Sequence, residues 1–354
     1  MNFLADLHFL DFVTSDKEKC FRLYFSILLN EHITENRQKA TLNKHSFKSL
    51  QKRLKQWYTM KIAVMHPSAT PPPSCREIIY EAKKLGSKVI YLRPQDVTVS
   101  YRENEIEIYR RGKKLDLDIV FVRGTSSPSS IEQFTWMTNV VKLFETVGSF
   151  TINSYSSIVL ARDKSILPAI LSKRSIKFPK TYITNDLQRA LGIVNELGKA
   201  VVKPIIGSLG RGVMMLENED VAYSILKQLL AWGQPLLLQE YIEKKEGRDI
   251  RLLVINGAVF AAYYRKARPG FFKTNLAQGG IPEKAELDNE LEKIAISTTE
   301  ALGLFYGGID VAESTDGGRF VLEANASPNW KGAQFLGLNP AKKLVEEAWK
   351  NFKK

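Results

Sequence analysis

Two acidic residues and an asparagine near the end of the chain are spaced as ligands of a metal ion. In an extended strand, side chains two residues apart project from the same face, so Glu323 and Asn325 should share one face while Leu322 and Ala324 point into the core. Asp310 ends another apolar run, and the turn signal at 315–318 returns the chain antiparallel. Such hard oxygen donors suit Mg2+, which takes further ligands from substrate phosphates. The pattern predicts a magnesium site for a nucleotide, with a solvated hairpin as the alternative.

A second candidate site is the segment 200–216, which is predicted to form a strand, a glycine loop and a second strand. The loop contains three glycines and a serine, Gly207, Gly210, Gly212 and Ser208. Their backbone N–H groups can approach phosphate oxygens closely. Lys203 lies in the apolar strand before the loop, and because burying an unpaired ammonium is costly, its charge should meet a ligand phosphate or a carboxylate. The alternatives are an ordinary hairpin and an edge-strand lysine in solvent.

Further along the chain, basic residues on strands and loops are candidates for binding anions. Arg251 and Arg265 are flanked by apolar residues of two strands that the hairpin signal at 256–257 joins. Lys273 and Asn275 follow on a glycine-containing loop that could close over a ligand. An earlier apolar strand ends in residues whose backbone could contact an adenine edge, Glu240, Tyr241 and Ile242.

The composition indicates a soluble globular protein of two or three domains whose surface attracts anions. The chain has 354 residues, of which 44% are apolar and 25% charged, and its formal net charge is +13. That charge favours nucleic acid, nucleotides or acidic small molecules as partners. Cys20 and Cys75 are too few for a disulfide framework and fit a reducing compartment, so the protein is expected in the cytoplasm. The sequence shows neither an apolar run long enough to span a bilayer nor an export signal.

The histidines are confined to the first part of the chain. All four, His8, His32, His45 and His66, precede residue 67. Histidine triads, zinc–histidine sites and imidazole bases are therefore largely excluded from the rest of the chain, where chemistry must depend on Lys, Arg, carboxylates and metal.

Strand and helix patterns divide the chain into an N-terminal extension and an α/β body. Residues 1–59 fit two amphipathic helices with a basic run at 44–55. Met60 begins an apolar strand, so residues 1–59 are expected to be a dispensable extension or a mis-assigned start, with a genuine helical appendage as the alternative. In residues 60–155, alternating strands and helices predict a mostly parallel sheet covered on both faces. A helix over 156–173 is expected to lead into the second domain.

The order of these features resembles the ATP-grasp carboxylate–amine ligases and, within them, the RimK-like group that adds glutamate. The resemblance covers residues 150–332, and its strength is in the order of the motifs, because each motif alone is weak. The motifs are Asn153-Ser154, Ala161–Lys164, Val202–Pro204, Gly207–Gly212, Leu238–Ile242, Gly247–Arg251, Lys273–Leu276, Gly279-Gly280, Gly308–Val311 and Leu322–Pro328.

The resemblance implies an α/β and α+β architecture, the ATP-grasp fold. In that fold two α+β lobes, 156–242 and 243–354, clasp ATP after a parallel-sheet pre-ATP-grasp domain, 60–155. For ATP it implies adenine against Glu240, Tyr241 and Ile242, phosphates at Gly207, Ser208, Gly210, Gly212, Lys164 and Lys203, ribose near Asp249, and Lys273, Thr274 and Asn275 closing on the triphosphate. It also implies Mg2+, or Mn2+ in its place, on Asp310, Glu323 and Asn325.

The chemistry that the resemblance implies is amide-bond formation. A carboxylate has no usable leaving group, so transfer of the γ-phosphoryl group of ATP gives an acyl phosphate, which the amine of an amino acid, in this group L-glutamate, then attacks. Arg265 and Arg251 are expected to hold the acyl phosphate, because Arg offers a fixed fork of donors to such oxygens. The products are ADP and phosphate, and homo-oligomers are common in the family.

The acceptor of the amino acid stays open between an acidic cofactor and a protein tail. Lys273-Thr274-Asn275 replaces the Arg-Ser-Asn of the ribosomal-protein ligases and is similar to ligases that modify pterin or deazaflavin coenzymes. Trp330 could stack on such a flat ring while Lys331 meets an acidic tail. A lysine-biosynthesis type of ligase acting on a carrier protein is another option.

A basic RNA- or ribosome-associated binding protein with a non-catalytic ATP-grasp shell is the competing class. Its contact would be the basic run at 44–55. The residues expected to bind metal and phosphate are all present. This argues against an ATP-grasp fold that has lost its activity and against nucleic acid as the partner.

Overall fold

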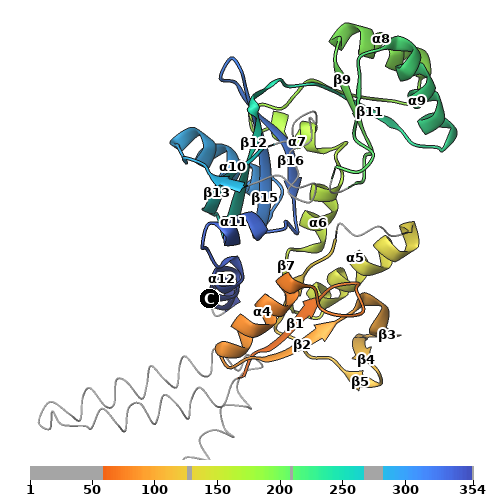
Figure 1. Cartoon of the computed structure of the whole chain (residues 1–354). Helices are drawn as coiled ribbons and strands as arrows, with labels where there is room; N and C mark the ends of the chain where they lie inside the picture. The colour runs from red at the N-terminus through yellow and green to blue at the C-terminus, as the bar shows by residue number, and fades with distance from the viewer. Residues whose placement is uncertain (1–58, 126–129, 208–209, 267–281, 353–354) are drawn as a thin grey trace, which may run out of the picture. The chain divides into compact units, whose positions relative to one another are not determined.

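The first described sheet is parallel and has helices on both faces (Figure 1). The computed structural model describes residues 59–125, 130–207, 210–266 and 282–352, so the predicted extension at 1–59 lies outside it except for Thr59. The sheet has four strands in the order β2-β1-β6-β7, all paired in parallel. They are β1 (Lys61–Met65), β2 (Lys88–Leu92), β6 (Ile119–Val122) and β7 (Phe150–Ile152).

Two helices cover the two faces of this parallel sheet. Ile62 and Val64 of β1 share a core with α4 (Pro73–Lys84), whereas Ala63 and Met65 share another with α5 (Ile131–Thr146). Because neighbouring side chains in a strand point to opposite faces, α4 and α5 lie on opposite sides. Ser130 begins α5 with a reciprocal capping box to Gln133. The prediction of a parallel sheet covered on both faces is confirmed.

An antiparallel hairpin sheet interrupts the chain between β2 and β6. Its strands are β3 (Val97–Arg102), β4 (Glu105–Arg110) and β5 (Lys113–Lys114), preceded by the short helix η1 (Pro94–Asp96).

The helix expected over 156–173 is two helices, α6 (Tyr155–Arg162) and α7 (Leu167–Ser172). Asp163 leaves the helical conformation, and its carboxylate accepts a hydrogen bond of 2.8 Å from the backbone N–H of Ser165. Its backbone instead forms an isolated bridge with Ile206. Pro168, which lacks an N–H, is tolerated only because a new helix begins beside it. The break places the residue after Asp163 next to the glycine loop.

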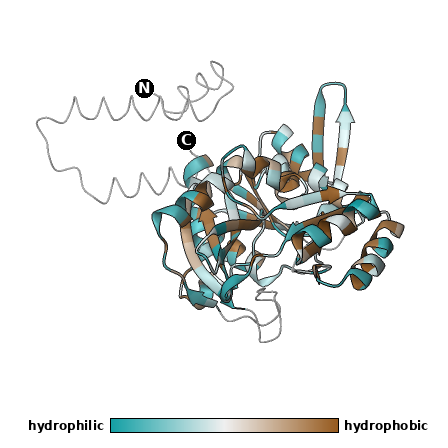
Figure 2. Ribbon diagram, turned by 90° about the horizontal axis from the view of Figure 1, so that it is seen from above, coloured by the Kyte–Doolittle hydropathy of each residue, from teal (hydrophilic) through white to brown (hydrophobic). Residues whose placement is uncertain are grey.

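The second sheet is antiparallel, with the order β10-β9-β11-β8 and helices on one face. Its strands are β8 (Thr181–Thr184), β9 (Ala200–Lys203), β10 (Met214–Leu216) and β11 (Leu236–Glu240), and its helices are α8 (Leu187–Leu197) and α9 (Glu219–Ala231). Ala200 and Val202 pack with these helices. Strand alternation therefore turns Val201 and Lys203 to the uncovered face. Helices in Figure 2 carry hydrophobic and hydrophilic residues on opposite sides, as this packing requires.

The third sheet is also antiparallel and has five strands in the order β14-β13-β12-β15-β16. They are β12 (Lys244–Ile255), β13 (Ala258–Lys266), β14 (Pro282–Lys284), β15 (Tyr306–Ser314) and β16 (Arg319–Asn325). The helices of this part are α10 (Asn289–Ala301), α11 (Lys331–Phe335) and α12 (Pro340–Phe352). No helix in the described ranges combines the length and apolar character needed to cross a membrane.

Candidate active site

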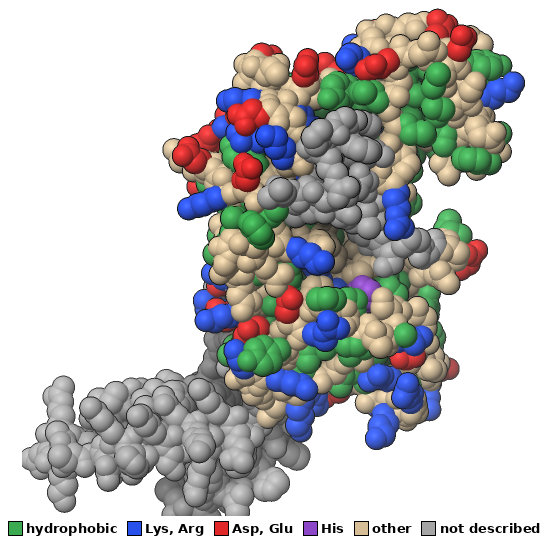
Figure 3. All heavy atoms as spheres, in the orientation of Figure 1, with side chains coloured by type: hydrophobic (Ala, Val, Ile, Leu, Met, Phe, Trp, Pro, Cys, Tyr) green, Lys and Arg blue, Asp and Glu red, His purple; other side chains and the backbone are tan. Residues whose placement is uncertain are grey.

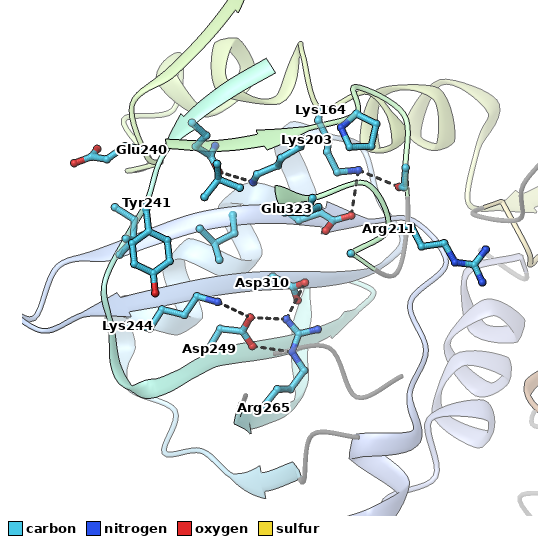
Figure 4. A pocket seen from close by; sticks show the side chains of 18 residues that line it. Lys164, Lys203, Arg211, Glu240, Tyr241, Lys244, Asp249, Arg265, Asp310 and Glu323 are labelled. Carbon is cyan, nitrogen blue, oxygen red and sulfur yellow. Dashed lines mark hydrogen bonds and ion pairs between the residues drawn. The ribbon is translucent and has the colours of Figure 1, made fainter. Parts of the chain in front are cut away.

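A pocket lined by the sheets β10-β9-β11-β8 and β14-β13-β12-β15-β16 collects most of the predicted site residues (Figure 4). The uncovered face of the second sheet supplies Val201, Lys203 and Gln239, and the third sheet supplies Asp249, Arg265, Asp310 and Glu323. The pocket is also lined by Lys164, Gly207, Gly210, Glu240, Tyr241 and Ile242. Arg251, Gly212 and Asn325 do not line it within the described chain. Ser208, Lys273, Thr274 and Asn275 lie outside the described residues.

Lys203 ends β9 and turns its ammonium group toward Gln239, whose Oε1 accepts a hydrogen bond from it. Thr181 Oγ1 in turn accepts from the amide nitrogen of Gln239 at 2.9 Å, which orients that amide. Burial lowers the pKa of Lys203 to about 8, and the neighbouring ammonium groups of Lys164 and Lys244 act in the same direction. An anion in the pocket would relieve this cost, as the sequence predicted for this lysine.

Lys164 connects the glycine loop to the third sheet. Its backbone N–H donates to Ile205 O at 3.1 Å, and its Nζ donates to Gly207 O at 3.0 Å. The same Nζ lies 3.5 Å from Glu323 Oε1. Position 207 favours glycine, because a Cβ there would lie 2.9 Å from Pro204 Cγ. The structure thus places a cation between the loop and a candidate metal ligand.

Two buried arginines and two buried aspartates form an ion network at the pocket, which three of them line. Arg265 Nε and Nη2 donate to Asp249 at 2.8 and 2.9 Å, and Arg265 Nη2 lies 3.0 Å from Asp310 Oδ2. Arg251 binds Asp310 through Nε and, at 2.8 Å, through Nη2. Burial alone would lower the pKa of Arg265, but Asp249 and Asp310 raise it above its usual value. The ion pairs therefore hold all four side chains in fixed positions.

The two candidate carboxylates for a metal lie directly opposite each other on neighbouring strands. Asp310 of β15 pairs with Glu323 of β16, and Asn325 pairs with Gly308 further along. Among the described residues, no three His, Cys, Asp or Glu side chains gather as a metal cluster, so the donor set is two carboxylates and one amide. These oxygen donors fit Mg2+, which needs few protein ligands when phosphates supply others. In this structure Arg251, Arg265 and Lys164 balance the two carboxylates.

The prediction that Leu322 points into the core is wrong. The register shifts between Asp310, which pairs with Glu323, and Val311, which pairs with Val321, so Leu322 is the extra residue of a β-bulge. Val321 and Ala324 are both buried, and Leu322 lines the pocket beside Glu323. The bulge changes the alternation on which the sequence argument depended.

The suggestion that Trp330 stacks on a ligand is also wrong. Its side chain is 1% exposed, and its Nε1 donates to Glu77 Oε2 at 2.8 Å. The ring packs against Tyr306, with centroids 5.7 Å apart. The neighbouring Lys331 is exposed. The indole belongs to the core because Glu77, 253 residues away in sequence, satisfies its N–H.

Two basic residues of the pocket were missed by the sequence argument. Lys244 begins β12 and lies 3.7 Å from Asp249 Oδ2, and Arg211 projects from the glycine loop (Figure 4). Both carry sequence signals, since Arg211 lies between Gly210 and Gly212 and Lys244 follows the strand end at 240–242. The backbone N–H groups of Glu240 and Tyr241 donate to Lys180 O and Lys199 O, so donors for an adenine edge must come from neighbouring positions.

Comparisons with known proteins agree with this arrangement. Residues 161–348 match the family model of the RimK-like ATP-grasp domain. The chain is 32% identical over 291 residues to a probable alpha-L-glutamate ligase of Enterobacter sp. (strain 638), which covers 81% of this chain and 94% of that protein. It is 31% identical to the ribosomal protein bS6–L-glutamate ligase of Shigella flexneri serotype 5b (strain 8401), with the same coverage of 81% and 94%.

A solved structure shows the same fold. The ATP-grasp ligase PsnB, complexed with a phosphomimetic variant of its minimal precursor, Mg and ADP, superposes with a TM-score of 0.67 at 21% identity. The match covers 84% of this chain and 99% of that one. The predicted fold class is therefore confirmed.

Proposed function

The chain belongs to the RimK-like ATP-grasp family, and from that premise we propose that it is an ATP-dependent ligase joining the amine of L-glutamate to a carboxylate acceptor. The names of its relatives as glutamate ligases support the amino acid. The observation that carries the proposal is the placement of Asp310 opposite Glu323, with Lys164 between Glu323 and the glycine loop.

We assign the two ends of the pocket to the two ends of ATP. Lys164, Lys203 and the glycine loop suit the phosphates, because both lysines, Gly207 and Gly210 line one pocket and the backbone of a glycine loop can approach phosphate oxygens closely. Glu240, Tyr241 and Ile242 suit adenine, and Asp249 the ribose, since all four line the same pocket. Asp310, Glu323 and Asn325 would hold Mg2+, or Mn2+ in its place, which would polarise the phosphoryl oxygens when bound.

In the proposed reaction, the side chains of the pocket bind the substrates, orient them and stabilise the developing charge. The acceptor carboxylate attacks the γ-phosphorus, ADP leaves, and an acyl phosphate forms; the glutamate amine then displaces phosphate to give the amide. Arg265 lines the pocket, so its guanidinium is proposed to meet the acyl phosphate. Arg251 lies behind Asp310 and is proposed to act mainly by positioning that carboxylate.

A peptide or protein carboxylate is the proposed acceptor. The burial of Trp330 removes the stacking surface that suggested a flat coenzyme, and a relative named for a ribosomal protein supports a protein tail. On the face shown in Figure 3, basic side chains are interspersed with acidic and uncharged ones. This face therefore offers no continuous basic patch that would support the RNA-binding alternative.

The test is a product assay with ATP, Mg2+, L-glutamate and a short peptide that ends in glutamate. We expect ADP and phosphate together with a peptide one glutamate longer, seen by mass spectrometry. Hydroxylamine should trap the acyl phosphate as a hydroxamate, and glutarate, which lacks the amine, should give no extended peptide. Formation of AMP and pyrophosphate would reject the acyl-phosphate scheme.

A further inference from the structure

The parallel sheet has a topological switch point between β1 and β6. From β1 the chain passes through α4 to β2 on one side, and it later returns to β6 on the other side. Because α4 and α5 cover opposite faces, their connections diverge at the carboxyl ends of β1 and β6. In open α/β sheets this divergence leaves a crevice in which ligands bind. The first residues beyond the two strands are His66 and Arg123, and Arg123 N donates to Met65 O at 2.8 Å.

Arg123 is a buried cation with unused donors. Its residue exposure is 5%, and among the described residues its Nε and Nη1 have no hydrogen-bond partner. Its Nη2 donates to Pro328 O at 3.0 Å. The guanidinium lies 4.5 Å from the ring centroid of Trp330 and 5.6 Å from that of Tyr306. These cation–π contacts offset only part of the cost of removing a charge from water.

The described residues supply no carboxylate within ion-pair distance of Arg123. Glu77 accepts a hydrogen bond from the indole N–H of Trp330, the ring that Arg123 contacts. The segments outside the described ranges that follow residue 59 contain no Asp or Glu in their sequence. A buried guanidinium without a carboxylate partner is costly, so we expect a bound ligand to supply the anion.

His66 adds a second donor at the same strand ends. Its Nδ1 accepts from Ser68 N at 3.0 Å, and burial together with Arg123 lowers its pKa to about 4. At neutral pH the ring is uncharged, so Nε2 carries the hydrogen. Gly124 leaves room for the ring, because a Cβ there would lie 2.6 Å from His66 Nε2.

Arg123 is linked to the strands of the candidate metal ligands through Pro328 and Gly308. Pro328, whose carbonyl Arg123 binds, packs against Gly308, where a Cβ would lie 2.6 Å from Pro328 Cβ and 3.2 Å from Arg251 Nη1. Gly308 pairs with Asn325. We propose that Arg123 and the N–H of His66 form a subsite for a carboxylate of one of the two substrates, an inference that rests on the proposed function. Arg is suited to this role because its planar fork matches a carboxylate.

The experiment is calorimetry on the full chain with Mg2+ and a non-hydrolysable ATP analogue, using L-glutamate and a glutamate-terminated peptide as separate probes. In Arg123→Met we expect the affinity for one probe to fall about tenfold or more, since a hydrogen-bonded charge is lost. Arg123→Lys, which keeps the charge without the fork, should lose less. Affinity for the nucleotide should not change, and the matched control Arg76→Met removes an exposed cation at the start of α4 and should leave every affinity unchanged.

The probe that weakens identifies the source of the carboxylate, the incoming amino acid or the acceptor. The proposal is overturned if the wild-type protein binds neither probe, or if both affinities persist in Arg123→Met while stability alone falls, because Arg123 would then only join β6 to the 326–330 turn. If Arg123→Met does not fold, the same criteria apply to Arg123→Lys. Arg123-dependent binding without any ligation would reject the proposed function and keep the carboxylate site.

Discussion

In the part of the chain that the structure describes, buried arginines occur in two regions, and their surroundings differ. In the third sheet, Arg251 and Arg265 share the carboxylates of Asp249 and Asp310. At the end of β6, Arg123 has two aromatic rings and one carbonyl oxygen. The first arrangement neutralises charge within the protein and fixes side chains before a ligand arrives. The second leaves charge and donors unpaired, which is the arrangement expected where the partner is a ligand.

The largest expected effect concerns the carboxylates of the paired region. Glu323→Ala removes the proposed metal ligand opposite Asp310 and should lower kcat about a thousandfold, because the developing phosphoryl charge loses its stabilisation. The measurement is ADP release at saturating substrates. Glu300→Ala, which changes an exposed carboxylate on α10, is the control and should retain activity. Full turnover in Glu323→Ala would remove the metal assignment.

The next effect tests whether the paired arginines depend on their partners. Asp249→Asn keeps the shape of the side chain but leaves Arg265 with one carboxylate fewer, so the free energy of unfolding should fall by about 3 kcal/mol. Urea denaturation followed by circular dichroism gives this value. A change smaller than that of an exposed ion pair, such as the one lost in Glu196→Gln, would show that the network is not buried as described.

A tenfold effect is expected from pH. Because burial lowers the pKa of Lys203 to about 8, its ammonium loses a proton as the pH rises from 7 to 9. Phosphates bind the charged form, so nucleotide affinity should be highest below pH 8 and about tenfold weaker at pH 9. Lys203→Arg stays charged over this range and should give a flat profile. Titration of a fluorescent ADP analogue at each pH provides the measurement, and a flat wild-type profile would contradict the prediction.

The smallest effect sharpens the contrast between the two regions. Arg123→Met gives up one hydrogen bond to Pro328 O but also removes an uncompensated charge, so the free energy of unfolding should change by less than about 1 kcal/mol. Thermal and urea unfolding of this variant beside Asp249→Asn would show the difference. Equal losses in the two variants would mean that Arg123 is as well paired as Arg265.

Local spacing was enough to predict the candidate metal strands. The turn at 315–318 joins β15 to β16 and brings Asp310 opposite Glu323, so pattern and register agree. Lys203 was likewise placed inside a sheet with its charge toward the pocket. The parallel sheet followed from the alternation of strands and helices in residues 60–155.

Features that depend on distant partners could not be predicted in this way. The bulge at Leu322 is a register shift between β15 and β16 that the residue pattern does not reveal, and the N–H of the buried Trp330 is satisfied by Glu77. Arg123 is a single basic residue after an apolar strand, and its contact with Pro328 spans 205 residues. Composition and periodicity contain no information about such contacts, because they are fixed only when the chain has folded.

The double contact of Lys164 bears on which form of nucleotide the pocket accepts. Its ammonium is already shared by Gly207 O and Glu323, so a lone phosphate ion would have to draw it away from a carboxylate and leave that carboxylate bare. When the nucleotide binds together with its divalent cation, both groups find a new partner. The ammonium of Lys164 then contacts phosphate, and the carboxylate of Glu323 contacts the cation. We therefore expect the pocket to bind the nucleotide–cation complex in preference to orthophosphate or uncomplexed ATP.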